Sequence, residues 1–216
     1  MSYIGSKPAN KPVVASDLDP AVITGQTALA TSPADTDEFL ISDAGVLKRL
    51  DASLIGGGGK IGQVVSTNKT DTFSASVATE AFSSIVTGLT VNITPSASSS
   101  KILVFVNMNV GAPGEHGLAV KLFRDSTQID LGDASSSRAR LSKGRIFNYA
   151  GSDAEAPLSL NFLDTPSSTS QITYGVKIGH SSGSAKTLYV NRSDNDPDDL
   201  SYGRGTSTIT VMEVLA

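Results

Sequence analysis

Short apolar and polar stretches separated by turn-forming residues recur from Lys60 to the C-terminus, and this pattern constrains the fold more than any other feature. The intervening Ser, Gly, Asp and Pro residues fall at spacings of about 8–15 residues, which is typical of a β-sandwich or barrel. No stretch carries a convincing helical stripe. We therefore expect an all-β fold with strands at Ile61–Thr67, Thr70–Ser76, Phe82–Ile85, Leu89–Thr94, Lys101–Val110, Leu118–Arg124, Thr127–Leu131, Leu158–Leu163, Ile172–Ile178, Thr187–Asn191 and Ser207–Val214.

The pattern inside individual segments predicts which faces are buried. Leu89–Thr94 and Ser207–Val214 alternate between apolar and polar residues, so one face of each should pack on a core. Lys101–Val110 begins with a continuous apolar run, so we expect it at the centre of a sheet, covered on both faces for part of its length. Ala134–Arg145 is rich in basic residues without an apolar stripe, and we expect it to be an exposed loop.

Four consecutive glycines, Gly56–Gly59, mark the clearest boundary because they have no side chains to pack and maximal backbone freedom. The prolines before this run prevent a long helix there. Within that segment, Asp37–Leu50 holds two apolar runs joined by an Asp-Ala-Gly turn, which predicts a small β-hairpin. The expected organisation is an extended attachment arm at residues 1–55, a Gly-rich linker at 56–60 and a β-sandwich knob at 61–216.

The composition argues against several classes of function. The 17 Lys and Arg against 21 Asp and Glu give a net charge of −4, whereas nucleic-acid binding normally needs a surplus of cations. The absence of cysteine removes thiol catalysis, cysteine-held metals and disulfides, and the two histidines are too few for most histidine metal sites. No run approaches the roughly 18 apolar residues of a membrane helix. We expect neither membrane insertion nor a secretory signal.

Motifs that resemble catalytic sites fail on their context. Gly179–Gly183 matches G-x-S-x-G, the pattern that presents a nucleophilic serine in α/β-hydrolases, but no helical pattern follows it. No histidine after His180 completes the order of a catalytic triad, so a Gly/Ser turn is the better interpretation. Gly56–Lys60 lacks the first glycine and the final Ser or Thr of a phosphate-binding loop. We predict no catalytic residues, no cofactor and no enzymatic activity.

A further motif begins like a calcium-binding loop, with Asp194, Asp196 and Asp198 at alternate positions. Asp199 stands where that loop needs its glycine, and Gly205 stands where it needs a bidentate glutamate. A solvated acidic loop is therefore the expected structure, and no metal ligands are predicted. A calcium or magnesium site of another kind stays open as an alternative.

The chain from Lys60 to Ala216 contains, in this order, GKIGQVVSTNKTDTFS, VTGLTVNITPSASSSKILVFVNMNVG, LFRDSTQIDLGDA with an SRAR-type loop after it, LNFLDTPSSTSQITYGVK, TLYVNRS and GRGTSTITVMEVLA. These segments resemble the C-terminal β-domain of tail-fibre and other virion structural proteins of tailed phages, especially cyanophages. Near the N-terminus, MSYIGSKP and ATSPADTDEFLISDAGVLKRL resemble the start of short phage structural proteins, where such an arm joins the virion.

The resemblance implies a jelly-roll-like antiparallel β-sandwich that forms a homotrimeric knob on a short attachment arm, located in the virion and assembled in the host cytoplasm. The leading interpretation is a short tail fibre or knob that mediates adhesion to the host surface. Its partners would be further copies of itself, other virion proteins of the tail or capsid bound through residues 1–55, and a host-surface glycan. The alternative is a capsid decoration, or cement, protein whose arm binds the major capsid protein. A polysaccharide-degrading spike enzyme is the third interpretation, although the chain shows neither a β-helix repeat nor a placed carboxylate pair.

Contacts with a partner or receptor are expected on loops, because loops tolerate variation while the sandwich holds them in place. The basic loop is suited to anionic glycans, to a partner subunit or to a virion surface, and its alternative is a simple solvated loop. The candidate residues are Arg138, Arg140 and Arg145 in the basic loop, and Asn195, Asp196, Asp198 and Tyr202 in the polar loop before the final strand.

Overall fold

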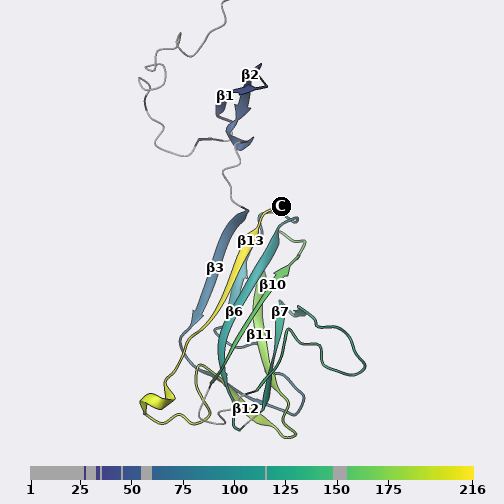
Figure 1. Ribbon diagram of the computed structural model, residues 1–216, viewed down its shortest axis with the longest axis vertical. Coiled ribbons are helices and arrows are strands. Elements are labelled where there is room, and N and C mark those ends of the chain that lie inside the picture. Colours follow the sequence, from purple (N-terminus) through teal and green to yellow (C-terminus); the bar gives the residue numbers. More distant parts are fainter. Residues whose placement is uncertain are drawn as a thin grey trace, which may run out of the picture. The chain divides into compact units, whose positions relative to one another are not determined.

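The computed structural model describes residues 27, 33–34, 36–44, 46–54, 60–114, 116–147 and 155–216. The chain divides into two compact units, residues 1–57 and 58–216, and each is described by itself. Within the described residues, strands and turns dominate, and the helical elements are short 3-10 turns at Ala52–Leu54 and Leu200–Tyr202 (Figure 1). The prediction of an all-β fold is confirmed.

The N-terminal unit contains the predicted hairpin. Strand β1 (Glu38–Asp43) pairs antiparallel with β2 (Val46–Asp51), and Asp43 lies opposite Val46 at the turn. Ala44 adopts a φ of 51° there, the left-handed conformation that so tight a turn requires. Ion pairs join Lys48 to Asp43 and Arg49 to Glu38 across the strands. Most of the predicted extended arm, including residues 1–26, lies outside the described residues.

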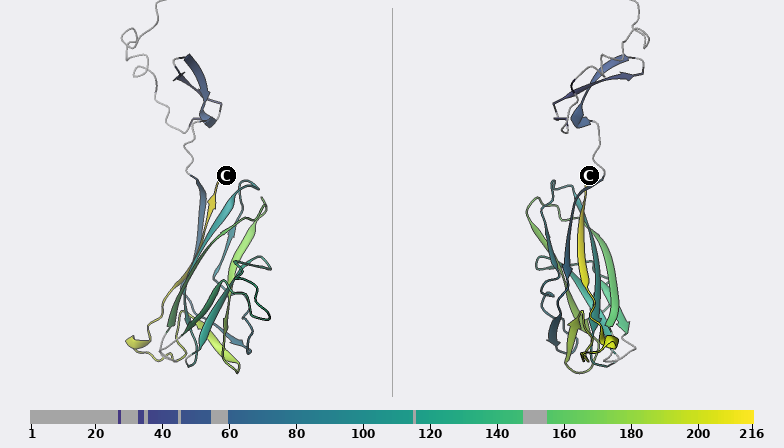
Figure 2. Two further views of the ribbon diagram at one scale, coloured as in Figure 1. Left: turned by 45° about the vertical axis from the view of Figure 1, so that its right-hand side comes forward. Right: turned by 90° about the vertical axis from the view of Figure 1, so that its left-hand side faces the viewer.

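The C-terminal unit consists of two antiparallel sheets. The six-stranded sheet has the order β3-β13-β6-β12-β4, with β10 paired along the other side of β6, and the five-stranded sheet has the order β5-β11-β7-β8, with β9 also paired to β7. Figure 2 shows the yellow β13 running between the blue β3 and the teal β6. The strands are β3 (Ile61–Lys69), β4 (Phe73–Val77), β5 (Thr90–Ile93), β6 (Lys101–Gly111), β7 (Gly117–Arg124), β8 (Thr127–Ile129), β9 (Lys143–Phe147), β10 (Glu155–Asp164), β11 (Ile172–His180), β12 (Lys186–Val190) and β13 (Ser207–Val214).

The strand pairing is that of a jelly roll. Strand β3 pairs with β13, β5 with β11, β6 with β10, and β7 with β9. These pairs are nested in sequence and alternate between the two sheets, as they do when one long antiparallel ribbon is rolled into a double-sheet sandwich. The jelly-roll architecture that we expected is therefore present, with β4, β8 and β12 as additions to it. The expected homotrimer stays a prediction.

The core lies between the sheets and contains the apolar side chains that alternate with polar ones along the strands. In β13, Ile209 and Val211 are fully buried, while Thr208 and Thr210 on the other face are partly exposed. The burial expected for Ser207–Val214 is thus confirmed. The largest fully buried apolar side chains come from both sheets and from the connections, and they include Leu89, Ile102, Leu118, Leu122, Tyr174, Ile178 and Leu188.

The central position expected for Lys101–Val110 is correct, but its coverage on both faces is not. Strand β6 pairs with β13, β12 and β10, and its inward residues Ile102, Val104 and Val106 are fully buried. Leu103 and Phe105 point the other way and are only partly buried. The continuous apolar run therefore reflects an apolar outer surface rather than a second covering layer.

One local prediction was right only in part and another was wrong, because tertiary pairing overrode the local pattern. The loop expected at Ala134–Arg145 ends in strand β9 (Lys143–Phe147). Strand β9 pairs antiparallel with β7, and the register of this pairing shifts near Leu118. The strand expected at Phe82–Ile85 is reduced to a single bridge between Phe82 and Gly179. There, the Ser83 hydroxyl accepts the hydrogen bond from the Ile178 amide, so a side chain replaces the backbone carbonyl of a regular ladder.

Candidate functional site

The outer face of the six-stranded sheet carries an apolar row that crosses four strands. The register places Val64 opposite Met212, Met212 opposite Leu103, and Leu103 opposite Leu163. Val64 is 56% exposed and Leu163 is 45% exposed. We call these four residues the apolar row. It lies near the beginning of β3, the strand through which the chain enters the sandwich.

Further along the same face, the cross-strand rows become polar. One row contains Ser66, Thr210, Phe105 and Asn161, and the next contains Asn68, Thr208, Asn107 and Ser159. Ser66 Oγ and Thr210 Oγ1 share a hydrogen bond of 2.8 Å. The outer face therefore changes from aliphatic side chains at one end of the sheet to hydroxyls and amides toward the other.

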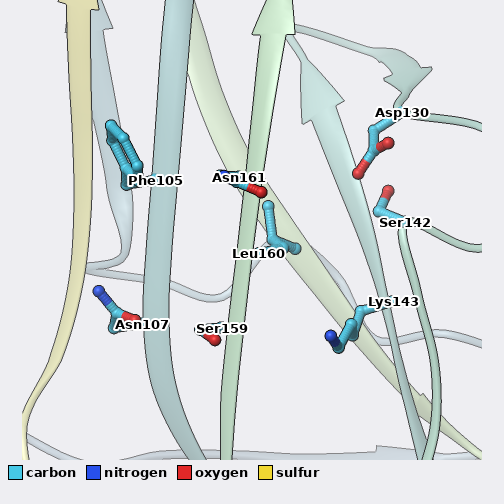
Figure 3. A pocket seen from close by; sticks show the side chains of 8 residues that line it. All are labelled: Phe105, Asn107, Asp130, Ser142, Lys143, Ser159, Leu160 and Asn161. Atoms are coloured by element: carbon cyan, nitrogen blue, oxygen red, sulfur yellow. The ribbon is translucent and has the colours of Figure 1, made fainter.

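A cleft of about 470 Å³ opens beside this polar zone (Figure 3). One wall consists of outward residues of β6 and β10, and the other consists of Asp130, Ser142 and Lys143 from the two ends of the β8–β9 connection. We call this feature the polar cleft. No local sequence pattern marks this cleft, because its walls come from three separate parts of the chain. Its lining residues are Phe105, Asn107, Asp130, Ser142, Lys143, Ser159, Leu160 and Asn161.

The basic loop predicted as a contact surface is partly tied to its own backbone. The guanidinium Nε of Arg140 donates to the carbonyl of Gly132 at 2.6 Å, and Gln128 Nε2 donates to the Arg140 carbonyl at 2.8 Å. Arg138 has an exposed side chain on the same connection. Arg145 belongs to β9, and the position of its side chain lies outside what the structure describes. Arg138 and Arg140 are therefore both exposed, and Arg140 is the one held by a hydrogen bond to the backbone of its own loop.

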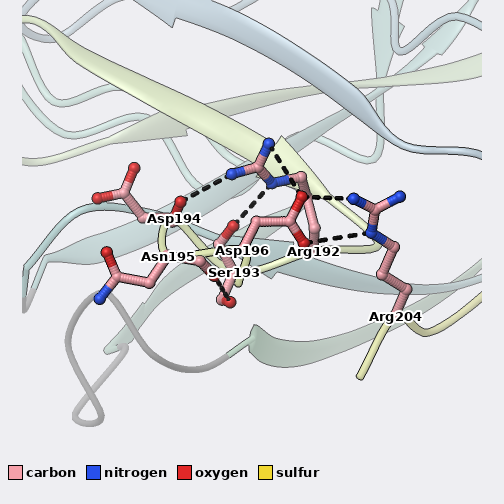
Figure 4. Close-up of polar contacts among 6 residues, drawn as sticks. All are labelled: Arg192, Ser193, Asp194, Asn195, Asp196 and Arg204. Carbon is pink, nitrogen blue, oxygen red and sulfur yellow. Dashed lines mark hydrogen bonds and ion pairs between the residues drawn. The ribbon is translucent and has the colours of Figure 1, made fainter. Parts of the chain in front are cut away.

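The polar loop before β13 is organised by two arginines around one carboxylate (Figure 4). Asp196 forms ion pairs with Arg192 at 3.5 Å and with Arg204. The hydrogen bond from Arg204 is the main cause that lowers the pKa of Asp196, and Arg192 adds to it. Arg192 also donates to the Asp194 carbonyl at 2.7 Å and lies over the Tyr189 ring, 4.4 Å from its centroid.

The other candidates in this loop surround that cluster. Asn195 and Asp198 are exposed, and Tyr202 is partly buried in the 3-10 turn that Asp199 caps by accepting from the Ser201 amide. The alternating aspartates do not gather around a common centre. Among the residues that the structure describes, no group of three or more His, Asp and Glu is placed to hold a metal ion.

The two candidate loops do not form a common site. In Figures 1 and 2, the yellow polar loop and the teal connection that carries Arg138 project from different sides of the sandwich. Whether either loop contacts a partner stays a prediction.

The G-x-S-x-G motif lies at the end of a strand and continues into a turn. His180 is buried, with Nε2 at 2.9 Å from the Val77 carbonyl, and Nδ1 accepts from the Ser182 amide at 3.0 Å. Both ring nitrogens are thus used by the backbone, and neither is available as a base for the serine of the motif, Ser181. The motif is the end of β11 and the start of its connection to β12 in the other sheet, so it is neither a strand-to-helix elbow nor the hairpin turn that we expected.

Two buried carboxylates hold parts of the sandwich together. Asp164 accepts two bonds from Arg124 Nη1, at 3.0 and 2.9 Å, and one from the Tyr174 hydroxyl at 2.7 Å. Burial, followed by the hydrogen bond to Asp164, raises the pKa of Tyr174 far above its ordinary value. Because Asp164 lies on β10 while Arg124 and Tyr174 lie on β7 and β11, these residues join the two sheets.

The second buried carboxylate belongs to Glu213, which is 1% exposed. It accepts from Gln63 Nε2 at 2.7 Å and from both the amide and the hydroxyl of Ser96 at 2.6 Å. Burial alone would raise the pKa of this carboxyl, but the bonds from Ser96 and Gln63 outweigh it and lower the pKa to about 2. Glu213 therefore fixes the β5–β6 connection to β13 as an anion.

Comparisons with known proteins give no family assignment. No protein-family model matches the sequence. No curated protein matches it in sequence either. The expected relationship to phage tail-fibre proteins therefore stays a prediction.

Among solved structures, the chain is similar to VP2 of infectious bursal disease virus in a subviral particle, with 17% identity and a TM-score of 0.36 over 81% of this chain. The structure of the Gt strain of that virus aligns with 17% identity and a TM-score of 0.34. The chain spans 41% of the length of each. Nothing about function follows from a likeness at TM-scores this low, and the jelly-roll assignment rests on the strand pairing. Among the described residues, no helix is long and apolar enough to cross a membrane.

Proposed function

We propose that this chain is a structural protein of a phage virion, in which the N-terminal unit attaches to the particle and the jelly-roll unit forms a homotrimeric knob that meets the host surface. The segments that resemble tail-fibre proteins of tailed phages support this proposal, and so do exposed apolar side chains on each of the two units. Adhesion would require no covalent chemistry.

The observation that carries the attachment step is the exposure of apolar side chains on both faces of the β1–β2 hairpin. Leu40 is 72% exposed on one face, and Phe39 and Val46 are exposed on the other. A two-stranded hairpin without a covering layer is at best marginally stable in water. Burial of these side chains against another virion protein would stabilise the hairpin and bind it to the particle.

The apolar row supports self-association of the knob. Its four side chains occupy adjacent strands and form a continuous aliphatic strip at one end of the sheet face. A second copy is the occupant we propose, because the strip lies close to Ile61, where each chain enters its knob. Association there brings the N-terminal segments of the copies toward one attachment point, as a knob on a common stalk requires.

Replacement of Val64 by glutamate tests the trimer. A charge within the apolar row should convert the purified protein from trimer to monomer in sedimentation equilibrium, because an unpaired carboxylate would be buried at the contact. Since Val64 is more than half exposed in the single chain, the fold should survive. Asn68→Glu is the matched control: it lies on the same strand and the same face, and it should leave the trimer intact. A native protein that sediments as a monomer would contradict this part of the proposal.

The virion role is tested by labelling intact particles with an antibody against the knob and imaging them by electron microscopy. Label at the tail supports adhesion. Label distributed over the capsid supports the alternative, a capsid decoration protein whose N-terminal segment binds the major capsid protein. Absence of label from particles, with the protein present in infected cells, contradicts both.

A further inference from the structure

The polar cleft contains side chains whose hydrogen-bonding groups are unused within the protein. Asn107, Ser159, Asn161, Asp130 and Lys143 form no hydrogen bond or ion pair with any described residue through their side chains. These side chains offer amide and ammonium donors beside amide, hydroxyl and carboxylate acceptors. Figure 3 shows them around one opening. The cleft therefore presents a mixed set of donors and acceptors to whatever enters it.

Several other amide side chains in the same unit are engaged internally. Asn191 Nδ2 donates to the carbonyls of Lys69 and Asp71, at 2.9 and 3.0 Å. Gln63 and Gln128 also donate to groups within the chain. Asn107 and Asn161 differ from them, because they lie exposed on neighbouring strands with free amides. Their position on paired strands, rather than on loops, holds them in place for a ligand.

Phe105 adds an aromatic surface to the cleft. It points away from the core, because its neighbours Val104 and Val106 are fully buried and side chains alternate along a strand. It lies directly opposite Asn161 on β10. The face of an aromatic ring is electron-rich and attracts polarised C–H groups. A ligand with both hydroxyls and a C–H face, such as a pyranose ring, matches this combination of an aromatic ring with amides.

The shape and charge of the surface further restrict the class of ligand that would fit. A second hollow of about 360 Å³ shares Asn107 and Ser159 with the polar cleft, so the surface continues along β6 and β10 beyond one binding position. The cleft lining holds one carboxylate, on Asp130, and one ammonium group, on Lys143. Their charges balance, which favours an uncharged ligand over a polyanion. Burial raises the pKa of Asp130, in keeping with its place at the wall of the cleft.

We propose that the polar cleft and the hollow beside it bind a neutral oligosaccharide, with Phe105 stacked against a sugar ring and Asn107, Asn161 and Asp130 bonded to its hydroxyls. This inference rests on the proposed function as a host-facing knob, since it names the chemistry that such a knob recognises. It places the site on β6, β10 and the ends of the β8–β9 connection, not on the arginine and aspartate loops. Each cleft is open and binds weakly, and several copies on one knob would supply the avidity.

The experiment first tests binding of the purified full-length protein to an array of immobilised neutral and anionic oligosaccharides. The neutral oligosaccharide that binds most strongly on the array is then titrated in solution, and its binding is measured by ligand-detected NMR. We expect neutral oligosaccharides to bind. Asn161→Ala should weaken binding at least tenfold, and so should Asn107→Ala. Asn68→Ala is the matched control, because Asn68 is an exposed asparagine on the same sheet face outside both hollows, and it should bind like the wild type.

Phe105→Ala tests the aromatic contact and should abolish binding, with circular dichroism confirming that the variant is folded. If the Phe105 variant does not fold, the two asparagine variants still test whether the polar cleft binds the ligand. Binding restricted to anionic oligosaccharides, binding unaffected by the cleft variants, or no binding to any glycan on the array would each overturn the proposal. This assay needs no particles, so its result is independent of the antibody labelling. If the protein binds neutral glycans but is absent from virions, the proposed virion role is refuted and the proposed glycan site is still supported.

Discussion

At the residue scale, the buried carboxylate of Glu213 makes the stability of the fold depend on pH in the acidic range. Its pKa is about 2 in the folded protein, against 4.5 as the ordinary value. A depressed pKa contributes stability that is fully present above about 4.5 and is lost as the pH falls toward 2. We predict that Glu213→Gln lowers the free energy of unfolding at pH 7 by about 1–3 kcal/mol, since the glutamine amide cannot accept all the bonds from Ser96 and Gln63.

The measurement is urea unfolding of both proteins at pH 7 and at several values between 4.5 and 2. The difference between the two free energies should shrink as the pH falls, because the wild-type carboxylate becomes protonated. Glu80→Gln, at an exposed carboxylate, is the control and should change stability by less than about 0.5 kcal/mol. A difference that stays constant over this range would mean that the Glu213 charge contributes nothing to stability.

At the element scale, the two sheets are joined by more than apolar packing. Asp164 on β10 holds Arg124 on β7 and Tyr174 on β11, so this polar cluster fixes how one sheet sits on the other. We predict that Asp164→Ala lowers the free energy of unfolding by about 3–5 kcal/mol, because it leaves a largely buried guanidinium without a partner. Tyr174→Phe keeps the ring and removes one hydrogen bond, so its loss should be about 1–2 kcal/mol.

Chemical denaturation of the single variants and the double variant measures both effects. The two losses should not add, because Tyr174 and Arg124 share the same carboxylate. Equal and small losses from both variants would show that apolar packing alone holds the sheets together.

At the scale of the whole molecule, attachment and recognition are expected to separate between the two compact units. We predict that a protein lacking residues 1–55 keeps the melting temperature of its knob and its trimeric state but no longer joins particles, because it lacks the apolar hairpin that we propose binds the virion. Thermal melting, sedimentation and immunoblotting of purified particles measure the three properties. Incorporation of the shortened protein into particles would count against both the tail and the capsid versions of the proposed function.

Features that depend on neighbouring residues were accessible from the amino-acid sequence. The β1–β2 hairpin and the burial in β13 follow from short-range alternation and turn residues, which act within a few positions of one another. Strand β9 was not accessible in this way, because Lys143–Phe147 has a weak strand pattern and is held by the edge of β7. The outward direction of Phe105 likewise depends on which face of β6 meets the other sheet.

The polar cleft is the clearest case of a feature that arises from the fold. Asn107 and Ser159 become neighbours because β6 and β10 pair in one register, and a shift of that register by one residue would turn Ser159 toward the core. Lys143 reaches the same opening from the far end of the β8–β9 connection. Local alternation therefore determines the strands and their buried faces, whereas pairing between distant strands determines which polar side chains meet, since that choice depends on the packing of the whole sandwich.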